Sequence, residues 1–177
     1  MKKTLVLTGL LALSTSVMAM DVEYFIGAGA ERGNMDTTVS AGTLSIGNKY
    51  KDTALKLKAG VILDKSHRIS LSRVGYSEQG GDFDLTNLNY DYILPLKNDF
   101  SLLAGAHLGV AEYDEPGYNM DGMDYGLQAG VLYDFTSNVQ LETSFAYTKY
   151  TVDGTFSGVK AEFDDSTSFY LGFNYKF

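Results

Sequence analysis

Few residues of this chain have side chains suited to catalysis. The sequence contains two histidines, His67 and His107, and no cysteine. The lack of cysteine excludes a disulfide scaffold, a thiolate zinc site and cysteine nucleophiles. A serine nucleophile needs a base beside its hydroxyl, so only the surroundings of the two histidines could support one. We therefore predict no catalytic residue, no cofactor and no metal ligand, and a protein that is not an enzyme.

Acidic side chains form a second candidate group, because carboxylate oxygens can hold calcium or magnesium. They gather in two stretches of the chain. The residues are Asp114, Glu115, Asp121, Asp124, Asp153, Glu162, Asp164 and Asp165. Their spacing fits no EF-hand loop, so solvated surface loops are the simpler interpretation.

The elements that must position these residues show a period of two. In the last segment Leu171, Phe173 and Tyr175 share one face, while Gly172 and Asn174 share the other. This period predicts β-strands, and eight such segments predict an all-β chain. They cover residues 22–31, 55–63, 67–76, 84–94, 100–112, 123–134, 139–150 and 168–177.

The connections between these segments alternate between short and long. The short ones are 64–66, 95–99 and 135–138, and the long ones are 33–52, 77–82, 114–122 and 151–165. Short and long connections therefore fall on opposite sides of an up-and-down sheet. Strands of about ten residues suit a tilted membrane span. We predict an eight-stranded antiparallel up-and-down transmembrane β-barrel.

The composition of the two strand faces indicates which one lies outside. Alternation alone also fits a soluble periplasmic barrel with an apolar core. Here the less apolar face is rich in glycine, which weakens an exposed strand but fits a crowded lumen. The apolar face carries aromatic residues near both ends, as at two membrane interfaces. They are Tyr24, Tyr92, Phe100, Tyr133 and Tyr175 at the short-turn end, and Tyr125, Tyr147 and Phe169 at the other.

Residues 1–19 have the features of a cleaved signal peptide. Lys2 and Lys3 precede an apolar run from Leu5 to Leu13, and a small-residue cleavage site follows. The full chain has 14 basic and 22 acidic residues, so loss of the two lysines leaves 12 basic residues and a net charge of −10. Such a charge disfavours nucleic acid as a partner.

The signal peptide, the eight alternating segments and the C-terminal Tyr170–Phe177 resemble the small Gram-negative outer-membrane barrels of the OmpA/OmpX type. The resemblance covers about residues 20–177, which would form the barrel domain. It implies export to the cell outer membrane. It also implies that Phe173, Tyr175 and Phe177 are the recognition signal for the barrel-assembly machinery.

Polar residues on the lumen face predict a buried ion-pair network, because buried charges must be paired. Asp91 and Glu142 are the expected partners of Lys56 and Lys58. Eight strands leave an interior just wide enough for side chains, so the network would plug the barrel. A gated ion path is the alternative. The full set is Lys56, Lys58, Asp91, His107, Gln128 and Glu142.

Two basic residues, Arg73 and Lys149, fall on the lipid face near the long connections. We expect them to contact lipopolysaccharide phosphates, and snorkelling of the side chains to the interface is the alternative. Their place predicts membrane lipid and lipopolysaccharide as partners of the barrel.

These features predict a structural and surface-interaction role, with loops that contact cell-surface partners. A narrow porin-like channel is one alternative. The resemblance suggests another, because some small outer-membrane barrels modify lipid A, and the deacylases among them use a serine and histidine pair. His67 is expected beside a short turn and His107 inside the lumen, and neither place is the lipid-exposed outer surface that such a reaction needs.

Overall fold

The computed structural model describes residues 21–42, 44–78, 81–115, 118–156 and 159–177. Within these ranges the regular elements are all β-strands. None of the described segments is a helix long and apolar enough to cross a membrane. The predicted signal peptide lies outside the described residues. The strands are β1 (Val22–Ala41), β2 (Leu44–Leu63), β3 (His67–Glu78), β4 (Gly81–Pro95), β5 (Phe100–Glu115), β6 (Tyr118–Asp134), β7 (Val139–Tyr150), β8 (Asp153–Phe156) and β9 (Val159–Lys176).

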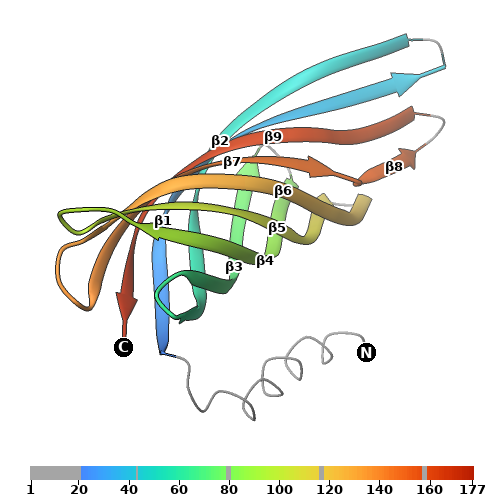
Figure 1. The fold of residues 1–177 in the computed structure, drawn as a ribbon. Helices are drawn as coiled ribbons and strands as arrows, with labels where there is room; N and C mark the ends of the chain where they lie inside the picture. The colour runs from blue at the N-terminus through green and yellow to red at the C-terminus, as the bar shows by residue number, and fades with distance from the viewer. Residues whose placement is uncertain (1–20, 43, 79–80, 116–117, 157–158) are drawn as a thin grey trace, which may run out of the picture.

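The strands form one closed antiparallel barrel (Figure 1). Each strand from β1 to β7 pairs with the next along the chain, β7 pairs with β9, and β9 pairs with β1 to close the ring. The four-residue β8 takes the place of β7 beside the first part of β9. The ring therefore has eight strands, and the predicted up-and-down barrel is confirmed.

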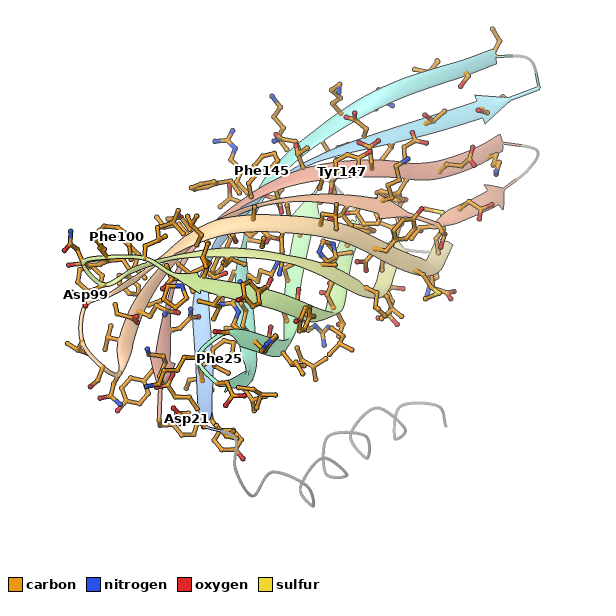
Figure 2. The ribbon with its side chains drawn as sticks, viewed as in Figure 1. Asp21, Phe25, Asp99, Phe100, Phe145 and Tyr147 are labelled. Carbon is orange, nitrogen blue, oxygen red and sulfur yellow. The ribbon has the colours of Figure 1, made fainter. Side chains whose placement is uncertain are left out.

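Side chains alternate between the outer surface and the lumen along each strand, as the period of two requires. In β9 about half of the Leu171 and Phe173 surface is exposed, whereas Tyr170 and Asn174 are each only 1% exposed. The apolar face is thus on the outside of the barrel. In β7, Phe145 and Tyr147 lie on this same outer surface (Figure 2).

Glycines on the inner face make room for the side chains that fill the lumen. A Cβ atom at Gly105 would overlap the Oδ1 atom of Asp91, and one at Gly172 would overlap the hydroxyl of Tyr170. The lumen at these two positions can hold a large side chain only because the opposing residue has none.

The connections at one end of the barrel are short turns, as predicted. Asp64, Lys65, Asn98 and Asp99 all have φ between 48° and 63°. Asparagine and aspartate tolerate this left-handed conformation better than most residues, which explains why they supply three of the four positions.

The predicted long connections at the other end are mostly strand, so their expected extent was wrong. β1 and β2 stay paired from Val22↔Leu63 to Ala41↔Leu44, across the whole of the expected 33–52 loop. The expected 151–165 loop likewise contains β8 and the start of β9. Where the strands extend past the apolar outer surface of the barrel, neither strand face needs to be apolar. The alternation of apolar and polar residues therefore no longer reveals the backbone pairing.

The ends of β1 and β2 near the long connections, residues 33–41 and 44–52, project from the barrel as a hairpin that we call the ribbon (Figure 1). The first part of β9 pairs with the β1 side of the ribbon, as far as Ala41↔Val159. β3 pairs with β2 only from Lys56 onward, so the outer edge of the ribbon has no neighbouring strand among the described residues. At its tip Gly42 has a φ of 61°, and a Cβ there would meet nothing within 4 Å. The ribbon is therefore a thin extension of the barrel wall.

Candidate functional site

We call the half of the lumen nearer the short turns the lower lumen, and the half nearer the ribbon the upper lumen. Arg68 on β3, which is 1% exposed, lies at the centre of the lower lumen. Its Nε donates to Asp91 Oδ2 at 2.9 Å, and its terminal nitrogens donate to Glu142 at 2.8 and 3.2 Å. These contacts join β3 to its neighbour β4 and to β7 on another part of the wall. Two carboxylates thus hold one guanidinium across the barrel.

Lys58 completes the charge balance of this cluster. Its Nζ lies 2.6 Å from Glu142 Oε1 and 4.0 Å from the centre of the Tyr170 ring. Asn174 donates to the other oxygen of Glu142 at 3.0 Å, and Gln128 donates to Asp91 Oδ1 at 2.5 Å. Two cations therefore face two carboxylates, and each of the four charged groups is hydrogen-bonded. We call it the ion-pair plug: Lys58, Arg68, Asp91, Gln128, Glu142 and Asn174.

The expected pairing of Lys56 with Asp91 or Glu142 is wrong. Lys56 Nζ instead lies 2.6 Å from Glu31 Oε2, and Tyr76 donates its hydroxyl to the other oxygen of Glu31 at 2.7 Å. Glu31 is on β1, directly beside β2, so a short diagonal contact satisfies Lys56 before it reaches across the lumen. Arg68 occupies the place beside Asp91 that the lysine was expected to take.

Several buried residues of the lumen are absent from the set predicted from the sequence, among them Glu31, Arg68, Asp124 and Asn174. Arg68, Ser70 and Ser72 are alternate residues of β3 and therefore share one face, and both serines point inward. This alternation is the sequence signal that could have placed Arg68 in the lumen. Asp124 was grouped with the acidic loop residues, whereas it lies on β6 and is completely buried.

The two histidines are held by other polar groups. His107 Nε2 lies 3.1 Å from Thr148 Oγ1 and 3.9 Å from Asp124 Oδ1. His67 Nδ1 lies 2.8 Å from the Tyr90 hydroxyl near the short-turn end. Across the described ranges no serine hydroxyl is hydrogen-bonded to either ring, so no serine and histidine pair of the hydrolase kind is assembled.

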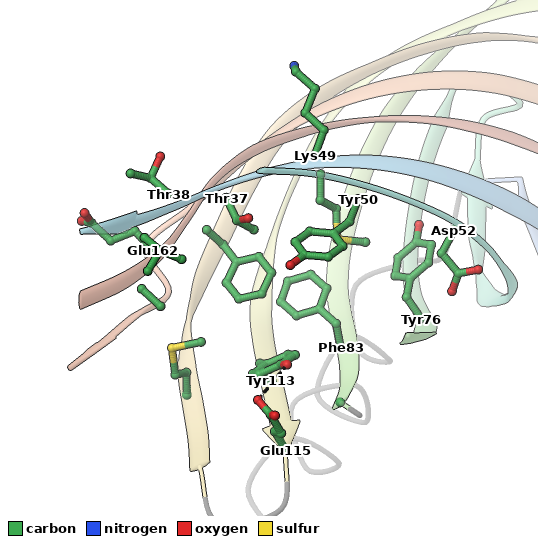
Figure 3. A pocket seen from close by; sticks show the side chains of 16 residues that line it. Thr37, Thr38, Lys49, Tyr50, Asp52, Tyr76, Phe83, Tyr113, Glu115 and Glu162 are labelled. Atoms are coloured by element: carbon green, nitrogen blue, oxygen red, sulfur yellow. Dashed lines mark hydrogen bonds between the residues drawn. The ribbon is translucent and has the colours of Figure 1, made fainter. Parts of the chain in front are cut away.

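The upper lumen is lined by apolar side chains, whereas the sequence predicts small and charged side chains throughout the lumen. Nine buried side chains form a cluster there: Met35, Val74, Tyr76, Phe83, Leu85, Ala111, Met120, Tyr150 and Val152. The rings of Phe83 and Phe163 stack with centroids 4.6 Å apart, and Tyr113 packs against Phe163 at 5.5 Å. Above the cluster lies an open cavity of about 610 Å³. We call this cavity and its walls the upper chamber (Figure 3).

The charged groups around the upper chamber lie near the long connections, outside the segments predicted to span the membrane. A hydrogen bond to Asp36, 2.8 Å away, raises the pKa of Lys49 above its ordinary value. Burial raises the pKa of Tyr113, and the nearby Glu115 carboxylate adds to the shift. Both side chains therefore keep their protons at neutral pH, so Lys49 is cationic and Tyr113 is a hydrogen-bond donor.

The remaining predicted site residues lie on the outer surface. Arg73 is 3.1 Å from Asp84 on the neighbouring strand β4, and both side chains are at least one third exposed. Lys149 is exposed and forms no ion pair with any other described residue. Phe173, Tyr175 and Phe177 are each more than half exposed and point outward beside one another. The structure thus does not bring Arg73 and Lys149 together, and neither side chain lies in the lumen.

The described residues contain no group of three or more histidine, aspartate or glutamate side chains placed to hold a metal ion. Some of the acidic residues near the long connections pair with lysines or hydroxyls. Glu162 lies 2.5 Å from Lys160, and Asp164 accepts a hydrogen bond from the Thr38 hydroxyl at 2.6 Å.

Comparisons with known proteins agree with this architecture. The chain matches no protein-family model, and no curated protein sequence is significantly similar to it. Among solved structures it resembles Neisserial surface protein A, with a TM-score of 0.59, 20% identity and coverage of 87% of this chain and 97% of the other. It also resembles OprH of P. aeruginosa, with a TM-score of 0.57, 20% identity and coverage of 86% and 99%.

A third similar structure is Ail, the attachment invasion locus protein of Yersinia pestis. Its TM-score is 0.50 and its identity 18%, with coverage of 89% of this chain and 99% of Ail. At these identities the likeness concerns the fold, and it extends over nearly the whole of each compared chain. The chain therefore has the outer-membrane β-barrel fold of the small eight-stranded OmpA/OmpX type.

Proposed function

We propose that this chain is an integral outer-membrane protein of a Gram-negative bacterium, exported through its signal peptide, with a structural and surface-interaction role. The outer surface supports the location. Leucine, valine and phenylalanine side chains are exposed around the barrel, and aromatic residues such as Tyr24 and Tyr125 stand near its two ends. Water would solvate such a surface poorly, whereas lipid suits it.

The single observation that carries the proposed role is the ion-pair plug. Arg68, Asp91 and Glu142 are each at most 1% exposed and bridge the lumen with complete hydrogen bonding. A sealed barrel of this kind is a rigid platform and not a pore. The narrow-channel alternative is therefore disfavoured. A lipid A-modifying enzyme is disfavoured as well, since no serine hydroxyl is hydrogen-bonded to His67 or His107 in the described structure.

Planar-bilayer recording tests the sealed lumen. We expect the folded wild-type protein to produce no discrete current steps. The double variant Arg68→Ala/Glu142→Ala removes the ion pair that bridges the lumen and should give small steps if it folds. The exposed pair Arg73→Ala/Asp84→Ala is the matched control and should stay silent. Regular steps from the wild-type protein would contradict the proposal.

The ribbon supports a role at the cell surface. β1 and β2, whose ends form the ribbon, have 20 residues each, whereas a tilted membrane span needs about 9 to 11. At its tip Leu44 and Ile46 are 74% and 66% exposed. A neighbour in fold is itself called an attachment protein. We expect Leu44→Ser/Ile46→Ser to reduce attachment of expressing cells to apolar surfaces.

The matched control for this test is Ser45→Ala/Lys49→Gln, which changes the opposite face of the same ribbon strand. Equal attachment by both variants and the wild type would remove the surface-interaction role while leaving the sealed barrel intact. Outer-membrane lipid, lipopolysaccharide at Arg73 and Lys149, and assembly machinery acting on Phe177 complete the proposed partners.

A further inference from the structure

The upper chamber is a built cavity at the long-stranded end of the barrel. Its volume of about 610 Å³ lies within the range of small-molecule sites. Figure 3 shows the rings of Tyr50, Tyr76, Phe83 and Tyr113 around a common space. Four aromatic side chains from β2, β3, β4 and β5 thus form much of the wall. Such a wall favours ligands with an apolar or aromatic body.

The chamber ends blindly toward the middle of the barrel. Below it Lys56, Glu31 and Tyr76 are joined by hydrogen bonds of 2.6 and 2.7 Å. The void at this level is only about 20 Å³, roughly the space of one water molecule. The ion-pair plug closes the lumen further down. A molecule that enters the chamber must leave by the same opening, so the cavity is suited to capture and not to passage.

The charge around the opening is negative. The lining includes Lys49 and the carboxylates of Asp52, Glu115 and Glu162. Lys49 is already paired with a carboxylate outside the lining, and Glu162 is paired with a lysine.

Two carboxylates therefore remain without an ion-pair partner among the described residues. Asp52 accepts a hydrogen bond from the Ser77 amide at 3.1 Å, and Glu115 accepts one from the Tyr113 hydroxyl at 3.2 Å. Neither contact cancels the negative charge. A ligand with a positive group is thus attracted to the opening, and a ligand with a carboxylate is repelled.

We propose that the upper chamber binds small organic cations that have an apolar or aromatic body and an amine or quaternary ammonium group. The body packs among the aromatic rings, while the cation lies against ring faces and near Asp52 and Glu115. Ring faces attract cations through their quadrupole, so aromatic walls and acidic rim select the same chemical class. This site goes beyond the proposed surface role and does not depend on the ribbon or its partners.

Binding of three indole compounds of similar size and different charge tests the proposal. They are tryptamine, a cation; tryptophol, which is neutral; and indole-3-acetate, an anion. The chain has no tryptophan, so indole fluorescence reports the ligand alone. The full chain is reconstituted into vesicles of zwitterionic phosphatidylcholine, and empty vesicles measure partitioning into lipid. We expect saturable binding in the order tryptamine, tryptophol, indole-3-acetate, with about a fivefold step from tryptophol to tryptamine.

Two variants separate the aromatic wall from the acidic rim. Tyr50→Ala removes a ring that is 41% exposed, so the barrel should still fold, and it should weaken all three ligands. Asp52→Asn/Glu115→Gln should abolish the preference for tryptamine over tryptophol. The matched control is Asp114→Asn, an exposed carboxylate that does not line the chamber.

Three results would overturn the proposal. They are tryptamine fluorescence no different from that with empty vesicles, equal affinity for the three ligands, and a tryptamine preference that survives in the Asp52→Asn/Glu115→Gln variant. None of them would bear on attachment through the ribbon or on the absence of conductance.

Discussion

The lower and upper halves of the same lumen are stabilised in different ways. In the lower half, ion pairs such as Arg68 with Glu142 join distant strands at fixed distances and angles. In the upper half, aromatic and aliphatic side chains such as Phe83 pack together mainly through apolar contacts. Directional contacts specify which residues must meet, whereas apolar packing tolerates rearrangement. This difference is what the proposals for a sealed lower half and a ligand-binding upper half require.

The largest expected effect comes from breaking the ion-pair plug. Arg68→Met keeps the approximate length of the side chain but leaves Asp91 and Glu142 buried without their main partner. Removing one member of a buried pair costs about 3–5 kcal/mol. We expect the free energy of unfolding in lipid vesicles to fall by that amount in a urea titration. Arg73→Met, at an exposed pair, is the control and should cost under about 1 kcal/mol.

The apolar half should be less sensitive to a comparable truncation. Phe83→Ala removes a ring that is 4% exposed and stacked on Phe163. Truncation of a buried phenylalanine costs about 3–5 kcal/mol, and here we expect a loss of about 2–3 kcal/mol because the ring already borders a cavity. The same urea titration measures it. A loss larger than that of Arg68→Met would reverse the comparison between the two halves.

A smaller effect is expected at the boundary between the halves. Glu31→Gln keeps an acceptor for the Tyr76 hydroxyl but removes the charge that faces Lys56. Hydrogen bonds to charged groups contribute about 1.5–3 kcal/mol, so we expect a loss near 1.5 kcal/mol. A double-mutant cycle with Lys56→Gln isolates the pair. A coupling energy indistinguishable from zero would show that the two residues act independently.

The smallest expected change in stability is on the outer surface. Arg73→Gln and Lys149→Gln should each alter the free energy of unfolding by less than about 0.5 kcal/mol. Their effect should appear instead as less lipopolysaccharide retained by the purified protein, because the phosphates lose two cationic partners. If the double variant retained as much lipopolysaccharide as the wild type, the lipopolysaccharide contact would be wrong. Snorkelling of the two side chains to the membrane interface would then explain their positions.

The fold was predictable from the sequence because the membrane imposes the same demand on every strand. Apolar side chains must face lipid and small or polar ones must fill the lumen, so residues such as Leu171 and Gly172 reveal their faces by parity alone. The same demand ends at the membrane surface. The ribbon over 33–41 and 44–52 is held by backbone hydrogen bonds, which do not appear in the alternation of side chains, so the sequence alone predicts a loop there.

The sequence predicts which residues face the lumen better than it predicts which of them form ion pairs. Parity places Lys58 and Glu142 inside the barrel, but which charges meet depends on strand tilt and stagger, and neither is visible in one strand's pattern. Glu31 reaches Lys56 through such a diagonal contact. The upper chamber was missed for another reason. Its lining comes from stretches expected to be loops, so residues such as Met35 and Phe163 were never assigned a face.

The turn at Gly42 has a practical consequence for anyone who uses this barrel as a scaffold. Its left-handed backbone and empty surroundings place no packed neighbour in the way of added residues. A foreign epitope inserted after Gly42 would be carried at the far end of the ribbon, well away from the charged lumen. Such fusions could present antigens or affinity tags on living bacteria without disturbing the wall that holds them.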